Sequence, residues 1–434
     1  MAITNVSGST TVTTSSTGGS SYRSALAIVT ALFFMWGFLT ALNDILIPHL
    51  RSIFELNYTQ SMLVQFAFFS AYFVFALPSG KIIEWIGYKR TMVFGLFTMA
   101  VGALLFIPAA SVPSFPLFLG ALIVLAAGIT VLQVSANPYV SILGPAQTAS
   151  SRLNLTQAFN SLGTTIAPYL GSLFILGGVA LTATELQQLS PEALHAYRIH
   201  QAASVKMPYV AIALALVALG LAIALYRLPR IETTRDFRPI KAGERGDSIW
   251  HYPHVVLGAV AIFVYVGAEV AIGSFLSNYL NQPEIGNFPL QTAAKLVSLY
   301  WLGAMVGRFI GSAVLQKANP SRILGFSAIV ACLLVILSML SFGHVAVWSI
   351  LLVGFFNSTM FPTIFTLGIA EMGPLTGKAS GLLIQAIVGG AVIPLVQGAI
   401  ADKVGIHHAF VLPVICYIFI AYYGFRGSRV VVRA

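Results

Sequence analysis

The stretch GKIIEWIGYKR, residues 80–90, stands between two long apolar runs near residues 59–84 and 90–110. A helix of about 20 residues spans a hydrocarbon layer of about 30 Å, so each run is long enough to cross a bilayer. Two glycines and three of the four charged residues of the stretch are of interest: Gly80, Glu84, Gly87, Lys89 and Arg90. Glycine permits close helix approach, and the charges can pair with neighbouring helices. We therefore expect a membrane hairpin whose charged turn acts as a conformational latch; the alternative is an ordinary basic loop.

Charged residues make up 8% of the 434 residues, and hydrophobic residues make up 57%. Soluble domains carry roughly 25% charged residues, so a water-soluble core cannot account for this composition. The recurring apolar runs predict an all-α membrane protein of twelve transmembrane helices. These helices are expected near residues 24–50, 59–84, 90–110, 115–143, 150–177, 207–228, 254–280, 293–317, 322–342, 346–371, 378–401 and 409–425.

A polar segment after the sixth predicted helix divides the chain into two halves. Pro138 and Gly144 recur 224 residues later as Pro362 and Gly368, which indicates that the halves are copies. Two six-helix repeats in the same orientation are typical of alternating-access carriers. The expected organisation is a disordered cytoplasmic tail at 1–22, a six-helix bundle at 23–228, a cytoplasmic linker at 229–253, a second six-helix bundle at 254–425 and a cytoplasmic tail at 426–434.

The formal charge of +10 follows the ends of the predicted helices. If both termini are cytoplasmic, 17 of the 23 Lys and Arg residues lie on the cytoplasmic side, five lie outside, and Arg308 falls within a helix. Short loops rich in Lys and Arg remain cytoplasmic, so this distribution is a topology signal. It predicts a multi-pass protein of the inner (plasma) membrane and argues against nucleic-acid binding.

Two carboxylates stand out inside predicted helices, away from the helix ends, where an ionisable residue is costly and indicates function. Asp44 shares a helical stripe with Trp36, and we expect it to take up and release a proton; alternatively, it is merely solvated at the outer interface. Glu269 lies one turn after Tyr265. It either binds a substrate hydroxyl, shares the proton coupling, or pairs with an arginine such as Arg308. The rings of Trp36 and Tyr265 are suited to stacking on the apolar face of a sugar.

Amide side chains recur in the fourth and fifth predicted helices. Gln133 and Asn137 are one turn apart, and Asn154, Gln157 and Asn160 recur every three residues. An amide offers both donors and an acceptor, so these side chains suit sugar hydroxyls. The alternative is that they hold helices together, since polar side chains also serve as contacts between membrane helices.

Several long strings resemble the bacterial fucose and glucose/galactose proton symporters of the major facilitator superfamily. The charged stretch at residues 80–90 also has the G-x-x-x-[DE]-x-x-G-x-[KR]-[KR] pattern of that superfamily. The strings are NDILIPHL at 43–50, ANPYVSILGP at 136–145, RLNLTQAFNSLGTTIAP at 152–168, YVGAE at 265–269 and FPTIFTLGI at 361–369.

The resemblance implies the major facilitator fold and proton-coupled import of a hexose. It implies that Asp44 is a coupling carboxylate and that Gln157 and Asn160 are sugar ligands; Asn43, beside Asp44, is a further candidate ligand. The fucose carriers have a Glu before the ANP motif, where this chain has Gln133, which cannot titrate. This departure, together with the YVGAE string, favours the glucose/galactose branch.

No catalytic residue, prosthetic group or metal site is expected. The coupling ion is expected to be H⁺, with Na⁺ as the alternative, because a carboxylate with nearby amide oxygens can also bind that ion. The expected partners are a hexose and the lipid bilayer, and the expected functional unit is a monomer. Rival interpretations are an exporter or uniporter of the same fold, a membrane receptor, and an intramembrane enzyme, for which the motifs are lacking.

Overall fold

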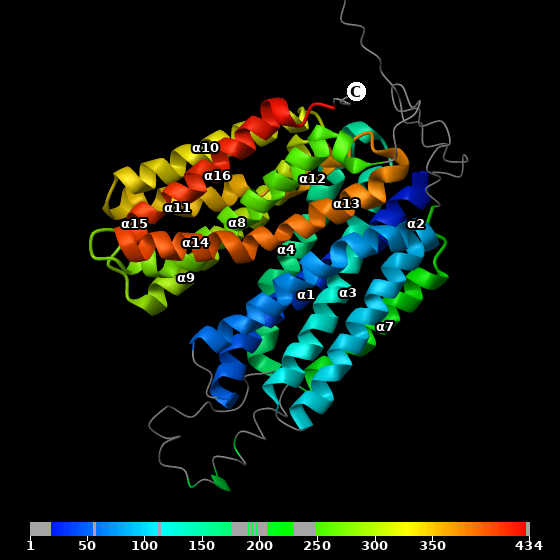
Figure 1. The fold of residues 1–434 in the computed structure, drawn as a ribbon, viewed down its shortest axis with the longest axis horizontal. Helices are drawn as coiled ribbons and strands as arrows, with labels where there is room; N and C mark the ends of the chain where they lie inside the picture. Colours follow the sequence, from blue (N-terminus) through cyan, green and yellow to red (C-terminus); the bar gives the residue numbers. More distant parts are fainter. Residues whose placement is uncertain are drawn as a thin grey trace, which may run out of the picture.

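The computed structural model describes residues 19–54, 58–111, 114–174, 206–229 and 248–430, with four isolated positions between 190 and 197. Within these residues, side chains are described except at 19–21, 42–62, 168–174 and four single positions. The described residues form helices and connecting turns, with no strand (Figure 1).

Five long helices make up the described part of the first half of the chain. They are α1 (Gly19–Phe54), α2 (Tyr58–Ser111), α3 (Phe115–Ile142), α4 (Ala149–Phe174) and α7 (Lys206–Leu225). The second half is more interrupted. Its helices are α8 (Pro253–Asn281), α9 (Leu290–Val314), α10 (Pro320–Leu340), α11 (Gly343–Asn357), α12 (Met360–Gly368), α13 (Thr376–Gln385), α14 (Gly389–Val404), α15 (Ile406–Ala409), α16 (Val411–Tyr422) and a π-helical turn at Tyr423–Gly427.

Ten helical stretches of the described residues are long and apolar enough to cross a membrane. One of them is a hairpin, because α2 breaks at Gly87, where φ is 77° and ψ is 165°. Dividing α2 there gives eleven spans, and α4, which has 26 residues and is more polar, is the twelfth. The predicted twelve-helix fold is confirmed. The boundaries differ slightly, since the first helix begins at Gly19 and not near residue 24.

The helices form two bundles that meet at one end of the molecule and diverge at the other (Figure 1). Helices α1 to α7 make one bundle, and α8 to α16 make the other. The contacts between bundles pair α2 and α3 with α13, and α4 with α9 and α12. The bundles meet at the end that we call the basic end. Exposed Lys and Arg side chains gather at the turns of this end. They include Arg90, Arg227, Lys317 and Arg322.

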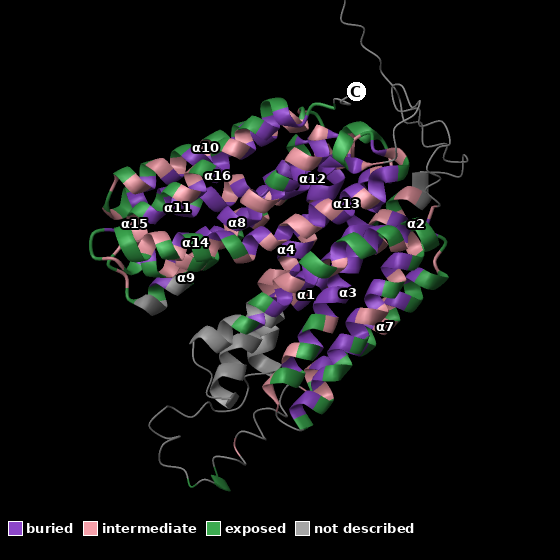
Figure 2. Cartoon of the chain, viewed as in Figure 1, coloured by how far each residue is buried: buried purple, intermediate pink, exposed green. Residues whose placement is uncertain are grey.

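Many large apolar side chains are exposed, whereas many polar side chains are buried. Figure 2 shows buried positions where helices pack against one another and exposed positions along their outer faces. Phe66 is 65% exposed and Leu395 is 74% exposed, whereas Asn154 and Asn357 are 0% exposed. Water would penalise such a surface, but hydrocarbon does not. This distribution fits a protein whose solvent is lipid. The predicted linker and tails lie largely outside the described residues, so their boundaries stay predictions.

Candidate coupling and sugar site

Glu269 is held in the middle of α8 by a tyrosine one turn before it. The hydroxyl of Tyr265 donates to Glu269 Oε1 at 2.8 Å and lies 3.1 Å from the carbonyl oxygen of Asn357. The i, i+4 spacing places the two side chains on one face, as the sequence predicted. Tyr265 is 1% exposed, so the carboxylate is fixed by a side chain that cannot move freely.

Asn357 connects this pair to two further helices. Its Nδ2 donates to the hydroxyl of Tyr300 at 2.8 Å, and its Oδ1 accepts from the hydroxyl of Tyr417 at 2.8 Å. Asn357, Tyr300 and Tyr417 are each 0% exposed. Buried polar groups are favourable only when they are bonded, and here both ends of the amide are satisfied. The network joins α8, α9, α11 and α16 into a rigid frame around Glu269. The sequence analysis did not single out Tyr300 and Tyr417, and no motif marks them.

Arg308 of α9 interacts electrostatically with Glu269, but the two do not form an ion pair within 4 Å among the described residues. Its guanidinium instead contacts the first bundle. Nη1 donates to the hydroxyl of Ser161 and approaches the carbonyl oxygen of Gln157 at 3.4 Å. In this conformation the Glu269–Arg308 pair considered from the sequence is replaced by a contact of Arg308 across the bundles.

The amides of α4 point to different neighbours. Asn154 Nδ2 donates to the carbonyl oxygen of Arg308 at 2.6 Å, whereas Asn160 Nδ2 donates to that of Phe33 in α1 at 3.0 Å. A spacing of three residues falls short of the 3.6 residues of a helical turn, so positions six apart do not share a stripe. Gln157 lies between them and is 4% exposed. Asn154 and Asn160 therefore connect helices in this conformation, which was the alternative interpretation; their role toward a sugar stays a prediction.

Trp36, Gln133 and Asn137 lie in the interior of the first bundle. Trp36 is 6% exposed and packs on Phe33, with ring centroids 4.7 Å apart. Gln133 Nε2 donates to the hydroxyl of Tyr72 at 2.6 Å. Asn137 is 0% exposed, and neither of its amide atoms has a hydrogen-bond partner among the described residues.

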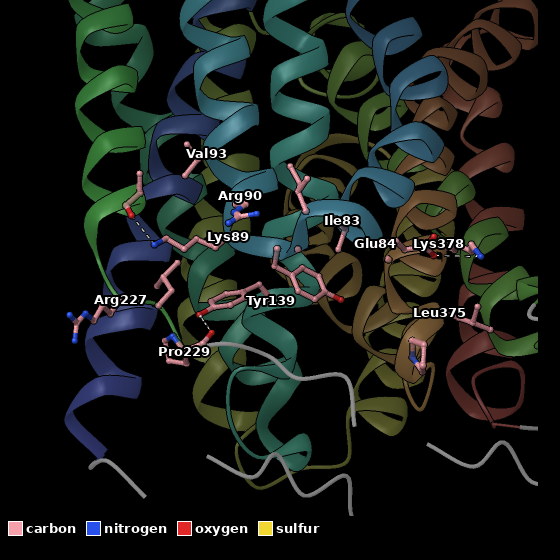
Figure 3. Close-up of a pocket in the computed structure, with 17 residues that line it drawn as sticks. Ile83, Glu84, Lys89, Arg90, Val93, Tyr139, Arg227, Pro229, Leu375 and Lys378 are labelled. Atoms are coloured by element: carbon pink, nitrogen blue, oxygen red, sulfur yellow. Dashed lines mark hydrogen bonds and ion pairs between the residues drawn. The ribbon is translucent and has the colours of Figure 1, made fainter. Parts of the chain in front are cut away.

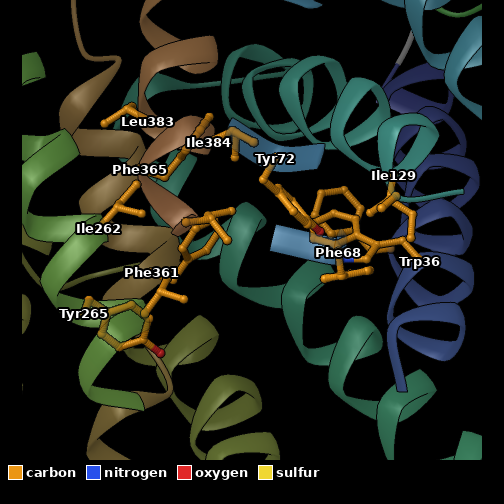
Figure 4. Packing of buried hydrophobic residues seen from close by; sticks show 14 of the residues in the cluster. Trp36, Phe68, Tyr72, Ile129, Ile262, Tyr265, Phe361, Phe365, Leu383 and Ile384 are labelled. Carbon is orange, nitrogen blue, oxygen red and sulfur yellow. The ribbon is translucent and has the colours of Figure 1, made fainter. Parts of the chain in front are cut away.

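Aromatic side chains from the two bundles gather in separate groups. Figure 4 shows Trp36, Phe68 and Tyr72 on one side and Tyr265 and Phe361 on the other. Phe68 and Tyr72 lie 5.4 Å apart between ring centroids, so the first group is packed together. Each bundle thus contributes buried rings that carry a polar handle nearby, an arrangement suited to a sugar ring.

Asn43 and Asp44 lie within α1. Their side chains fall outside the described residues, so the coupling role of Asp44 and the ligand role of Asn43 stay predictions.

The charged stretch that forms the turn of the α2 hairpin contacts the other bundle. Glu84 Oε1 lies 3.5 Å from Lys378 Nζ of α13, and the two side chains are 33% and 38% exposed. A Cβ on Gly80 would lie 2.7 Å from the carbonyl oxygen of Gly377, so the backbones of α2 and α13 approach closely there. Lys89 Nζ donates to the carbonyl oxygen of Ala224 in α7 at 2.8 Å. The sequence analysis did not identify Lys378 as the partner of Glu84.

A recess of about 1660 Å³ opens at the basic end beside this contact (Figure 3). Among the described residues, its wall carries four basic side chains and one carboxylate, that of Glu84; the basic residues are Lys89, Arg90, Arg227 and Lys378. Gly87 makes the turn there with a positive φ, which a side chain would strain. The five residues predicted to form a latch thus occupy one region, and two of them contact the second bundle directly.

Comparison with known proteins identifies the family to which this architecture belongs. Residues 25–387 match the family model of the Major Facilitator Superfamily. The glucose/galactose transporter of Brucella abortus is 50% identical over 408 residues, which cover 94% of this chain and 95% of that protein. The L-fucose–proton symporter of Escherichia coli is 35% identical over 405 residues, which cover 92% and 91%. A crystal structure of the transporter FucP in the outward conformation matches with a TM-score of 0.86 and 33% identity, covering 94% of this chain and all of that one.

The fold and these matches define a membrane transporter and not an enzyme. The chain belongs to the major facilitator superfamily, in the family that includes the glucose/galactose transporters and the fucose–proton symporters.

Proposed function

We propose that this chain imports a hexose, glucose or galactose, together with a proton by alternating access. The observation that carries the proposal is the identity of 50% with the Brucella abortus glucose/galactose transporter, sustained over 94% of this chain. Similarity over the whole helical region includes the residues that line the contact between the bundles, where carriers of this architecture bind their substrates. The E. coli relative, an L-fucose–proton symporter, supports coupling to H⁺.

Asp44 and Glu269 are the proposed proton carriers. Glu269 is supported by its position in mid-helix, by the hydrogen bond from Tyr265, and by the electrostatic interaction with Arg308. Gln133 occupies the position of a carboxylate in the fucose carriers and cannot titrate, so Glu269 is the remaining partner for Asp44. Sodium coupling is the competing possibility, and the experiment below separates the two ions.

The proposed sugar ligands come from both bundles. They are Trp36, Asn43, Gln133, Asn137, Gln157 and Asn160 from the first and Tyr265 and Glu269 from the second. Asn137 supports this assignment, because a fully buried amide with no partner among the described residues is ready to bond a hydroxyl. Gln157 Nε2 is likewise buried and has no hydrogen-bond partner among the described residues.

The basic end is proposed to face the cytoplasm, with both termini on that side of the inner membrane. The positive-inside rule supports this orientation. With the bundles in contact at the basic end, the structure then corresponds to a state closed to the cytoplasm, in keeping with the match to FucP in the outward conformation. We expect a functional monomer, because one chain contains both bundles.

The test is uptake of labelled glucose, galactose and fucose into proteoliposomes, with imposed proton or sodium gradients and with counterflow measured in parallel. We expect an inward proton gradient to concentrate glucose or galactose. Asp44→Asn and Glu269→Gln should lose accumulation and keep counterflow, because an amide still bonds but cannot carry a proton. Movement of none of these sugars would refute the substrate; accumulation that follows sodium and ignores pH would refute proton coupling.

A further inference from the structure

A line of polar side chains seals α4 of the first bundle against α9 and α12 of the second, and we call it the polar seam. It runs inward from the basic end. Its members are Ser150, Ser151, Asn154, Gln157 and Ser161 of α4, Arg308 and Ser312 of α9, Thr359 directly before α12, and Thr363 and Thr366 of α12.

One part of the seam is well bonded. The hydroxyls of Ser150 and Thr366 lie 2.6 Å apart. Ser151 Oγ donates to the carbonyl oxygen of Ser312 at 2.7 Å, and Ser312 Oγ donates to that of Ser151 at 3.0 Å. These bonds join the two bundles, and they break when the basic end opens. They therefore favour the closed state.

Another part of the seam is buried and unbonded. Thr359 is 6% exposed and Thr363 is 0% exposed, and neither hydroxyl has a partner among the described residues. Thr359 packs beside Asn154, because a Cβ on Gly311 would meet both side chains. Thr363 lies one turn further along α12, on the stripe between Thr359 and Thr366, so it faces the same seam. Asn154 Oδ1 also has no partner among the described residues.

A hydroxyl that is buried without a bond has lost its hydration and gained nothing in exchange. Opening the basic end returns such a hydroxyl to water, so each one favours the open state. We propose that Thr359 and Thr363 are positioning residues that keep the closed basic end weak enough to open in every transport cycle. An all-apolar seam of the same shape would close too firmly. The inference rests on alternation between two states and not on which sugar is carried.

The unbonded and the bonded parts of the seam allow two kinds of isosteric Thr→Val change, with opposite expected effects. Thr359→Val and Thr363→Val each remove one unbonded hydroxyl, and each should shift the open-to-closed ratio of the basic end about tenfold toward closed. Thr366→Val is the matched control on the same stripe. Thr366 donates within α12 to the carbonyl oxygen of Pro362 at 3.0 Å, so Ser150 is the donor across the seam. Loss of the Thr366 hydroxyl leaves Ser150 without this acceptor and should shift the open-to-closed ratio about threefold toward open.

The ratio is measured on the full chain in liposomes by pulsed electron paramagnetic resonance, without any sugar. Nitroxide labels at Gln147 and Lys317, exposed positions at the basic end of either bundle, report the separation, with Cys332 and Cys416 replaced by alanine. A shift toward closed is small in label distance when the wild type is already mostly closed, so the rate of counterflow is the second readout. This rate should fall about tenfold in Thr359→Val and in Thr363→Val, and should not fall in Thr366→Val.

Opposite shifts for the two kinds of variant support the inference. A shift toward open, or faster counterflow, in Thr359→Val or in Thr363→Val would overturn it, because it would mean that the hydroxyl removed is bonded in the closed state. Equal behaviour of all three variants would also overturn it. A chain that opens and closes as expected but moves no hexose would refute the proposed substrate alone, since the label distances do not depend on it.

Discussion

Replacement of Gly80 by alanine should open the basic end. A Cβ at this position would lie 2.7 Å from the carbonyl oxygen of Gly377 and 3.2 Å from its carbonyl carbon. Ordinary contacts begin near 3.4 Å, so α2 and α13 must separate by about 0.7 Å, the difference between 3.4 and 2.7 Å. Overpacking of a well-packed contact costs about 1–3 kcal/mol. The clash exists only while the basic end is closed, so the open-to-closed ratio should rise about 5- to 150-fold.

The assay is the distance between labels at Gln147 and Lys317, measured in liposomes without sugar. Two glycine changes serve as controls. Gly120→Ala should have no effect, because a Cβ there meets nothing within 4 Å. Gly128→Ala should lower thermal stability without changing the label distance, because its clash with Met99 lies inside the first bundle. A distance distribution for Gly80→Ala that matches wild type would refute the reasoning.

Two further predictions concern contacts at and away from the basic end. Glu84→Lys should raise the open-to-closed ratio by less than about fivefold, because Lys378 is partly exposed and such pairs contribute about 1 kcal/mol or less. Adding Lys378→Glu should restore the wild-type label distances. Failure of this rescue would argue against the pair. Asn357→Ala should leave Tyr300 and Tyr417 without partners and destabilise the fold by about 1–3 kcal/mol for each orphaned hydroxyl. Thermal denaturation in detergent measures this loss, and an unchanged midpoint would contradict it.

Much of the fold followed from the amino-acid sequence. Apolar runs set the twelve helices, because a bilayer requires about 20 apolar residues per span and allows few exceptions. The break at Gly87 was expected from the charged stretch around it. The sequence also predicted that Tyr265 and Glu269 share a face, because residues four apart on one helix face the same side; the hydrogen bond between them is a finding of the structure. Properties that arise within a single helix are thus accessible without coordinates.

The partners across the bundles were decided by the tertiary structure alone. Glu84 meets Lys378, and Arg308 meets Ser161, although each pair is far apart in the chain. Helical periodicity specifies which residues share a face, but not which other helix that face will meet. Asn160 illustrates the limit: its amide suits a sugar hydroxyl in sequence terms, yet here it bonds the backbone of α1. Lipid solvation selects the helices, whereas the choice of neighbour depends on shape and on hydrogen bonds that exist only after the two bundles have packed.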